Sequence, residues 1–252
     1  RHHYQVMQYF KKVNAKEIGL ELNALKNRLH FEAAYFDKVT KDLLTYVPGT
    51  NGVADGLSNF GSIKNNGVEL SASWVQKMNK DFTITISGNL TTYKNKVLEL
   101  AKDFAIVDGP SRTFIGQPIG SFFGYIVEGI YQSYADKLKS PINKEFSYGP
   151  GDFKYKDVNG DGVIDTKDRT IIGNPNPDFT YGGNITLNYK GFDLGVDVGG
   201  VYGNEIYRDW AGTEPSFQRV NYAEFIINRW HGEGTSNWVP ILGTDHLINN
   251  QY

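Results

Sequence analysis

The chain has 252 residues, no cysteine and a formal net charge of −2, with basic and acidic residues interspersed. The lack of cysteine excludes disulfides, thiolate metal sites and cysteine nucleophiles, and the lack of a basic stripe argues against nucleic-acid binding. No run approaches the roughly 20 apolar residues of a membrane helix, and no signal peptide opens the sequence. The mean hydropathy of −0.43 still fits a membrane barrel, because strands that alternate lipid-facing and lumen-facing residues average out as polar.

The first predicted element in the chain is a strand hairpin over residues 18–35. Apolar residues alternate with polar ones on both sides of a short turn at Lys26-Asn27, and a period of two is typical of strands with one apolar face. Two further hairpins, over residues 68–90 and 181–198, show the same alternation, the last with a turn at Lys190-Gly191. The sequence therefore predicts an all-β chain built from antiparallel hairpins.

The segments between and beyond the hairpins carry weaker signals. Gly116 to Gln132 is apolar and rich in glycine, which predicts another strand with bends at the glycines. Residues 103–111 and 135–151 predict loops. No helix longer than a turn or two is expected, and Asn221 to Trp230 is the best candidate because its apolar residues have helical spacing.

Alternation alone does not say whether the apolar face meets lipid or a protein core, because a soluble β-sandwich and a membrane barrel share the same binary pattern. Two observations favour the barrel. The predicted strands run about 8 to 12 residues, close to the 9 to 11 that cross a bilayer. The turn within each hairpin is short, whereas the connections after hairpins are long, as over 37–67 and beyond Tyr202. Outer-membrane barrels have this asymmetry.

Aromatic residues lie at both ends of the apolar face, with aliphatic residues between them. Those beside the short turns are Trp74, Phe82, Tyr189 and Phe192, and those at the opposite ends are Tyr35, Tyr181 and Tyr202. This is the layout of two interfacial aromatic girdles. The predicted fold is therefore an antiparallel transmembrane β-barrel segment with short turns on one side and long loops on the other.

The local motif with the most chemical content spans residues 157–168. Its spacing matches a calcium loop, and the predicted ligands are Asp157, Asn159, Asp161, Val163 through its backbone carbonyl, Asp165 and Asp168. Asp168 is shorter than the usual glutamate, and the alternative is an acidic turn-rich loop without an ion. Because carboxylates this close repel one another unless neutralised, we expect a structural Ca²⁺ that clips an external loop.

Aromatic and polar residues are frequent beyond the last predicted strand, and this combination suits the rings and hydroxyls of sugars. The candidate ligand-binding residues are Tyr207, Arg208, Trp210, Trp230, His231 and Trp238. The alternative is that these residues pack a long loop against itself. No nucleophile elbow, phosphate-binding loop, metalloprotease helix or glycosidase carboxylate pair is present. The chain is therefore not expected to be an enzyme.

Nine stretches, in order and over nearly the whole chain, resemble the SusC/RagA family of TonB-dependent transporters from Bacteroidetes. They are Glu17-Ile-Gly-Leu-Glu-Leu, Asn27-Arg-Leu-His-Phe with Tyr35-Phe, Lys41-Asp-Leu-Leu, Asn65-Asn-Gly-Val-Glu-Leu, Gly116-Gln-Pro-Ile-Gly-Ser-Phe-Phe-Gly-Tyr, Gly129-Ile-Tyr-Gln, Gly151-Asp-Phe-Lys-Tyr before the calcium-like loop, Asp168-Arg-Thr-Ile-Ile-Gly-Asn-Pro-Asn-Pro-Asp-Phe-Thr-Tyr-Gly, and Asn228-Arg-Trp-His-Gly-Glu-Gly. Each stretch alone is weak, and their order gives the resemblance its strength.

The resemblance implies a barrel of about 22 strands with an internal plug in the bacterial outer membrane. It also implies import of oligosaccharides or peptides, driven by TonB and assisted by a SusD-like surface lipoprotein. This chain would supply roughly 8 to 10 strands of bilayer-crossing length, without the plug and without a TonB-contacting segment. We therefore expect residues 1–252 to be part of the barrel, with the calcium-like loop as an insertion at 157–168.

A second function class competes with the importer. A soluble, calcium-stabilised β-sandwich that binds carbohydrate at its surface would show the same alternation. The two differ in what covers the apolar face of the strands, which is lipid in the barrel and a second sheet in the sandwich.

Overall fold

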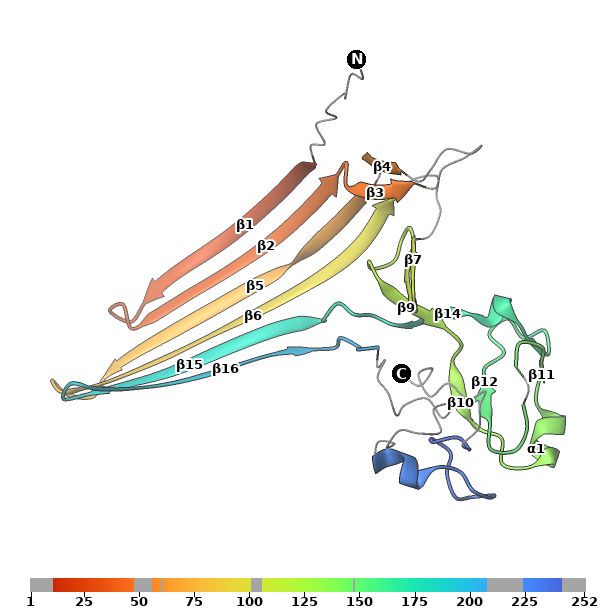
Figure 1. Ribbon diagram of the computed structural model, residues 1–252. Coiled ribbons are helices and arrows are strands. Elements are labelled where there is room, and N and C mark those ends of the chain that lie inside the picture. The colour runs from red at the N-terminus through yellow and green to blue at the C-terminus, as the bar shows by residue number, and fades with distance from the viewer. Residues whose placement is uncertain are drawn as a thin grey trace, which may run out of the picture. The chain divides into compact units, whose positions relative to one another are not determined.

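The computed structural model describes residues 11–47, 56–59, 61–100, 106–146, 148–207 and 224–241. Its largest element is a six-stranded antiparallel sheet in the order β1-β2-β5-β6-β15-β16 (Figure 1). These strands are β1 Lys12–Ala24, β2 Leu29–Lys41, β5 Ser62–Lys77, β6 Phe82–Glu99, β15 Phe179–Tyr189 and β16 Phe192–Tyr202. A small hairpin of β3 Leu44–Val47 and β4 Gly56–Asn59 lies between β2 and β5 in the sequence.

The register of the sheet aligns the apolar residues of all six strands on one face. Ile86, for example, lies opposite Trp74 on one side and Ile185 on the other, and Ile185 lies opposite Val196. This face is uncovered, since Ile18 is 73% exposed and Val198 62% exposed. In a sandwich these side chains would be buried under a second sheet, so the soluble alternative is not favoured.

Aromatic residues bound the apolar face at both ends, as the sequence predicts. At the short-turn end Phe82 and Tyr189 pair edge to face with ring centroids 5.9 Å apart. At the other end Phe179 stacks on Tyr202 at 5.0 Å. The register from one girdle to the other spans about 33 Å along the strand, or about 25 Å along the membrane normal at the usual tilt. That height matches the apolar band of outer-membrane barrels.

Two of the three short hairpin turns use left-handed backbone conformations, whereas no residue of the turn over 78–81 has a positive φ. Leu25, Lys26 and Asn27 have φ values of 56°, 58° and 61°, and the turn between β15 and β16 has φ values of 47° at Lys190 and 85° at Gly191. Positive φ at both central residues matches the right-handed twist of paired strands. The strand register places all three hairpin turns at the same end of the sheet, and the long connections leave from the other (Figure 1).

The sheet strands differ from the prediction in length and number. Strands β2 and β5 continue through Lys41 and from Ser62, so much of the expected connection over 37–67 is strand. The prediction of roughly 8 to 10 bilayer-crossing strands is wrong for the described residues, whose large sheet has six. The extensions were missed because their outward residues change from apolar to charged, which ends the alternation that marked the strands.

The chain divides into two compact units, of which the large sheet belongs to the first. The second contains residues Ser121–Asn174 and the described residues from Glu205 onward. Unlike the sheet, it has an apolar core of its own, formed by Tyr125, Ile130, Phe153, Tyr155 and Ile164, with Val127 and Trp230 packed against it. None of the helices in the described ranges is long and apolar enough to cross a membrane.

The second unit is built from short elements. They are β9 Ser121–Gly124, β10 Val127–Ile130, α1 Tyr134–Lys139, β11 Ile142–Asn143, β12 Phe153–Tyr155, β13 Val163–Ile164, the 3-10 helix Thr166–Asp168, β14 Thr170–Gly173 and the 3-10 helix Glu224–Asn228. Strand β14 pairs with β9, β12 with β10, and β13 with β11. Strands β7 Ile106–Asp108 and β8 Ser111–Thr113 precede β9.

Four local predictions need correction. Gly116 to Gln132 holds two strands instead of one, β9 and β10, with positive φ at Gly116, Gly120 and Gly129. The predicted loop over 135–151 contains helix α1, because the Ser133 hydroxyl caps the amide of Asp136. The predicted loop over 103–111 includes β7 and the start of β8. The predicted helix over 221–230 is a short 3-10 turn, and its first three residues lie outside the described ranges.

Candidate functional site on the polar face of the sheet

The face of the sheet opposite the apolar band carries polar side chains and a groove. The groove crosses β1, β2, β5 and β6 and has a volume of about 560 Å³. Side chains of alternate residues line it, and they include Glu17, Glu21, Glu32, Glu69, Asn89 and Thr91. In a barrel whose apolar face meets lipid, this face borders the lumen. The groove therefore presents carboxylates and hydroxyls on the face opposite the apolar band.

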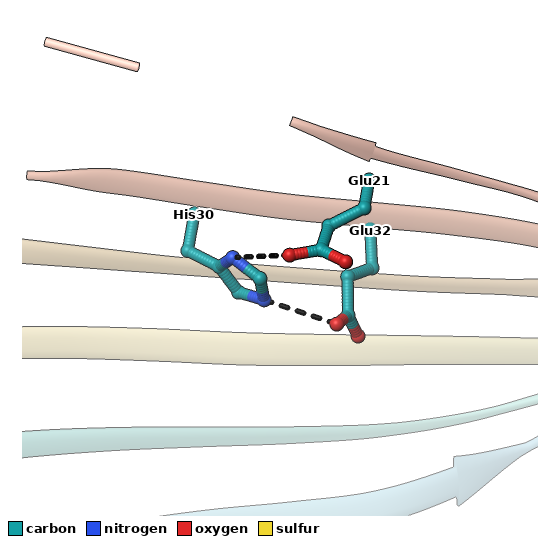
Figure 2. A group of neighbouring side chains, drawn as sticks. All are labelled: Glu21, His30 and Glu32. Atoms are coloured by element: carbon teal, nitrogen blue, oxygen red, sulfur yellow. Dashed lines mark hydrogen bonds and ion pairs between the residues drawn. The ribbon is translucent and has the colours of Figure 1, made fainter. Parts of the chain in front are cut away.

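Glu21, His30 and Glu32 form a cluster on this face (Figure 2), and Glu21 and Glu32 also line the groove. The His30 Nε2 lies 3.0 Å from the Glu32 Oε1, and the Nδ1 lies 2.9 Å from the Asn23 Oδ1 and 3.9 Å from the Glu21 Oε1. The Asn23 amide donates to the Glu21 Oε1 at 3.0 Å, and the Ser71 hydroxyl donates to the Glu32 Oε2 at 3.2 Å. Both ring nitrogens thus face side-chain oxygens.

Strand register explains why these side chains meet. Glu21 lies directly opposite Glu32, and Asn23 lies directly opposite His30, so all four point to the same face. Two carboxylates opposite each other repel, and the His30 ring lies beside both of them. Sequence reasoning placed Glu21, His30 and Glu32 on the polar side of the hairpin but did not predict the cluster. The position of the Lys26-Asn27 turn fixes which residues of the two strands lie opposite each other, and this register predicts the cluster.

Further along the same face, amides bridge neighbouring strands. The Asn184 amide donates to the Asp197 Oδ1 at 2.7 Å, and the Asn188 amide donates to the Asp193 Oδ1 at 2.6 Å. These contacts leave other carboxylate lone pairs free to accept. The arrangement can bind a polar solute by hydrogen bonds. Catalysis was not expected from the sequence, and nothing in this set of carboxylates and amides is arranged around a nucleophile.

The predicted calcium loop is a series of tight turns that its own carboxylates close. The Asp157 Oδ1 and Oδ2 accept from the amides of Gly160 and Gly162, both at 2.7 Å. Asn159, Asp161 and Asp165 each accept from the amide two residues later, at 2.8 to 2.9 Å. Every such oxygen keeps a second lone pair. The donor set is therefore all oxygen, as Ca²⁺ requires.

Asp168 differs from the other acidic residues of the loop because its side chain is fully buried. Its Oδ1 accepts from the amide of Val158 at 2.9 Å and that of Asn159 at 3.4 Å, and its Oδ2 accepts from the amide of Asp165 at 2.8 Å. Burial alone would raise the pKa of this carboxyl, but the hydrogen bonds from the three backbone amides lower it. Asp168 therefore closes the loop as a buried anion.

The predicted ligand-binding residues are only partly brought together. Trp230 is packed into the second unit, where its indole N–H donates to the Gln132 Oε1 at 3.2 Å. His231 is exposed, with its Nδ1 3.0 Å from the Arg229 carbonyl oxygen, and Trp238 is 64% exposed. Tyr207 contacts the Phe122 ring at 6.3 Å. Arg208 and Trp210 lie outside the described residues. Sugar binding by this set stays a prediction.

Comparison with known proteins places this architecture. The family model described as "TonB dependent receptor-like, beta-barrel" matches residues 11–238. The chain belongs to this barrel family. Proteins of this kind are outer-membrane β-barrels and not enzymes, and the SusC/RagA resemblance predicted from the sequence is confirmed.

Three relatives illustrate the match. TonB-dependent receptor P3 of Formosa agariphila is 32% identical over 89% of this chain and 23% of its own length. TonB-dependent receptor SusC of Bacteroides thetaiotaomicron is 27% identical over 80% of this chain and 20% of its own length. The structure of the RagAB peptide transporter superposes with a TM-score of 0.75 at 22% identity, covering 95% of this chain and 27% of that one. The chain thus spans about a quarter of the length of the relatives it matches.

Proposed function

We propose that this chain forms part of the wall of an outer-membrane importer of oligosaccharides or peptides that works with a SusD-like surface lipoprotein and draws energy from TonB. The observation that carries the proposal is the division of one sheet into two faces. An uncovered apolar face of bilayer height lies behind a polar groove lined by Glu21, Glu32 and Glu69. The relatives add support, since one solved structure bears the name of a peptide transporter.

The cargo class can be tested with the whole protein in its native host. A strain lacking the gene is grown on a panel of glycans and peptides, each as the sole carbon source. We expect growth to be lost on one of these polymer classes and retained on the corresponding monomers, because monomers need no dedicated importer. Undiminished growth on every glycan and peptide would overturn the proposal.

The same strain can show whether the polar face takes part in uptake. Complementation with Glu32→Lys and Glu69→Lys reverses two charges in the groove, whereas Lys26→Glu and Lys80→Glu reverse two charges at the short turns. We expect slower growth only with the groove variant, at equal levels of protein in the outer membrane. Equal growth with both variants would show that the charges of the polar face play no part in uptake.

The partner has its own test. The whole protein is extracted in mild detergent through an affinity tag, and co-purifying proteins are identified by mass spectrometry. We expect a lipid-anchored surface protein in near-equal amount. If the transporter is recovered alone from membranes that still import cargo, a lipoprotein partner is not required.

We also propose that the loop over 157–168 binds one Ca²⁺ as a structural clip. Support comes from the all-oxygen donor set of Asp157, Asn159, Asp161 and Asp165, whose second lone pairs are free to coordinate. These carboxylates are less tightly gathered than Glu21, His30 and Glu32, which among the described residues are the only three His or acidic side chains with ligand atoms mutually within 4.8 Å. Binding would therefore draw the loop inward.

Metal analysis of the purified whole protein tests the clip. We compare the wild type with a double variant, Asp157→Ala and Asp161→Ala, and with Glu145→Ala, an acidic control in the same unit. We expect calcium to be lost from the double variant only. Equal calcium content in all three would sink the metal proposal without touching the transport proposal.

A further inference from the structure

The strands of the large sheet continue past the apolar band on the long-loop side, and the outward face changes character there. The last apolar row contains Ile18, Tyr35 and Val68. The row directly beyond it contains Lys16, Asp37, Asn66 and Lys94, and the next contains Asn14, Val39, Lys64 and Lys96. Lys12 and Lys41 lie opposite each other one row further. We call Lys12, Lys16, Lys41, Lys64, Lys94 and Lys96 the lysine belt.

Most of the belt has no acidic partner on the protein. Two lysines are ion-paired, Lys64 with Asp37 at 2.6 Å and Lys12 with Asp42 at 3.4 Å. Glu99, opposite Ser62 beyond a register shift, is the other acidic residue beside these rows. Over the described ranges, Lys16, Lys41, Lys94 and Lys96 make no ion pair, and all four are exposed. The belt therefore carries a net positive charge that the protein leaves uncompensated.

The height of the belt identifies what it meets. One row corresponds to two residues along a strand, or roughly 7 Å, so the first lysines lie within one side-chain length of the apolar band. The long-loop end of an outer-membrane barrel is the external end. An outward-facing lysine at this level lies beside the headgroups of the outer leaflet, and clustered lysines beside a membrane attract anionic headgroups.

We propose that the lysine belt binds the phosphate groups of lipids in the outer leaflet and so forms a specific shell of anionic lipid around this part of the barrel. Ammonium groups are strong donors to phosphate oxygens. The groove on the other face is acidic, with Glu17, Glu21, Glu32 and Glu69. The wall therefore separates two charges, positive toward lipid and negative toward the lumen. This proposal rests on the outer-membrane location and is independent of the cargo.

The test uses the whole protein reconstituted in phosphatidylcholine vesicles that contain spin-labelled phosphatidic acid or spin-labelled phosphatidylcholine. Electron paramagnetic resonance gives the fraction of each label held at the protein surface. We compare the wild type with the triple variant Lys16→Gln, Lys94→Gln and Lys96→Gln. The matched control is Lys26→Gln, Lys80→Gln and Lys190→Gln, which removes the same charge from the short turns. A third variant replaces the three belt lysines by Arg.

We expect the wild type to prefer phosphatidic acid and the belt variant to lose about fivefold in that preference for each lysine removed. The control and the Arg variant keep the preference. Equal preference in the wild type and the belt variant would overturn the proposal, and so would equal losses in the belt and control variants, which indicate net charge alone. If inorganic phosphate competes more strongly than chloride at equal ionic strength, the belt is a site for free phosphate and the lipid assignment fails.

Discussion

The aliphatic side chains of β16 and those of the second unit have opposite surroundings. Leu194 and Val198 are 59% and 62% exposed, whereas Ile130 and Ile164 are at most 2% exposed. The sheet places its apolar residues on one face and leaves that face for the bilayer, while the second unit turns short elements inward to bury its own. The apolar face of the sheet is visible in the sequence because every second residue of a strand is apolar. The buried core of the second unit depends on contacts between segments that are far apart in the sequence.

The largest effect should come from placing a charge on the lipid face. Val196→Arg puts a guanidinium near the middle of the apolar band, where Arg costs about 2–4 kcal/mol of folding free energy in an outer-membrane barrel. Urea titration of the whole protein in vesicles measures the loss. Ser87→Arg is the control, because Ser87 lies at a similar depth on the polar face. Similar losses in both variants would contradict the assignment of the two faces.

A substitution at Gly151 should destabilise the second unit. This residue has φ +96°, and a Cβ there would lie 2.7 Å from the Trp230 ring and 2.8 Å from the Ile241 Cβ. Gly151→Ala therefore combines left-handed strain with overpacking, and we expect a loss of about 2–3 kcal/mol in this unit. Limited proteolysis of the membrane-embedded protein should show faster cleavage there while the sheet stays protected.

Gly234→Ala controls for the backbone conformation at Gly151, since Gly234 has φ +79° and open space at its Cβ. We expect a smaller effect from this variant. Should the two alanines accelerate cleavage equally, packing against Trp230 is not what makes Gly151 necessary.

A smaller effect is expected at Gln132, whose side chain joins two distant segments of the second unit. Its Nε2 donates to the carbonyls of Ile130 and Ser236, and its Oε1 accepts from the Trp230 indole and the Gly234 amide. Gln132→Leu removes all four bonds, which should cost about 1–3 kcal/mol through unsatisfied groups. The measurement is hydrogen exchange of the amides in 230–239, which should accelerate in the variant. Unchanged exchange there would mean that Gln132 does not hold this segment.

The smallest expected effect is on the pH dependence of the loop over 157–168. The pKa of Asp168 is lowered in the folded protein, so its contribution to stability is complete above the ordinary value of 3.8 and is lost as pH falls through the folded pKa. Hydrogen exchange of the Val158 and Asp165 amides should accelerate over that acidic range. Asp168→Asn should give fast exchange at every pH, and an unchanged acid profile in this variant would assign the transition to another group.

The sheet could be predicted well from the sequence because each lipid-facing residue is selected to be apolar independently of its neighbours. Each apolar residue of β15 and β16 meets the same solvent, so the period of two survives without help from distant positions. The extension of β2 past Tyr35 was missed because Asp37 and Lys41 on the outward face no longer look like a strand in lipid. Charged residues on the outward face end the apolar alternation, so alternation does not detect that the strand continues.

The second unit and the site were harder to predict for a different reason. Gln132 and Trp230 are far apart in the sequence, and no local periodicity couples them. Helix α1 depends on one capping hydroxyl at Ser133. The Glu21, His30 and Glu32 cluster was within reach of the sequence, because the hairpin turn alone sets its register. The chemistry of such sites follows from register more than from the identity of any single residue.

Gly67 has a consequence for the pairing of the central strands. A Cβ at this position of β5 would lie 2.0 Å from the Thr92 carbonyl oxygen and 2.9 Å from the Phe36 ring. Phe36 and Tyr93 are the direct neighbours of Gly67 on the two adjoining strands. The Phe36 ring thus lies over bare backbone and occupies the thickness of the wall. Any side chain at 67 would force the backbones of β5 and β6 apart as well as displace the ring, so the missing side chain is what lets three strands stay paired beside a bulky aromatic.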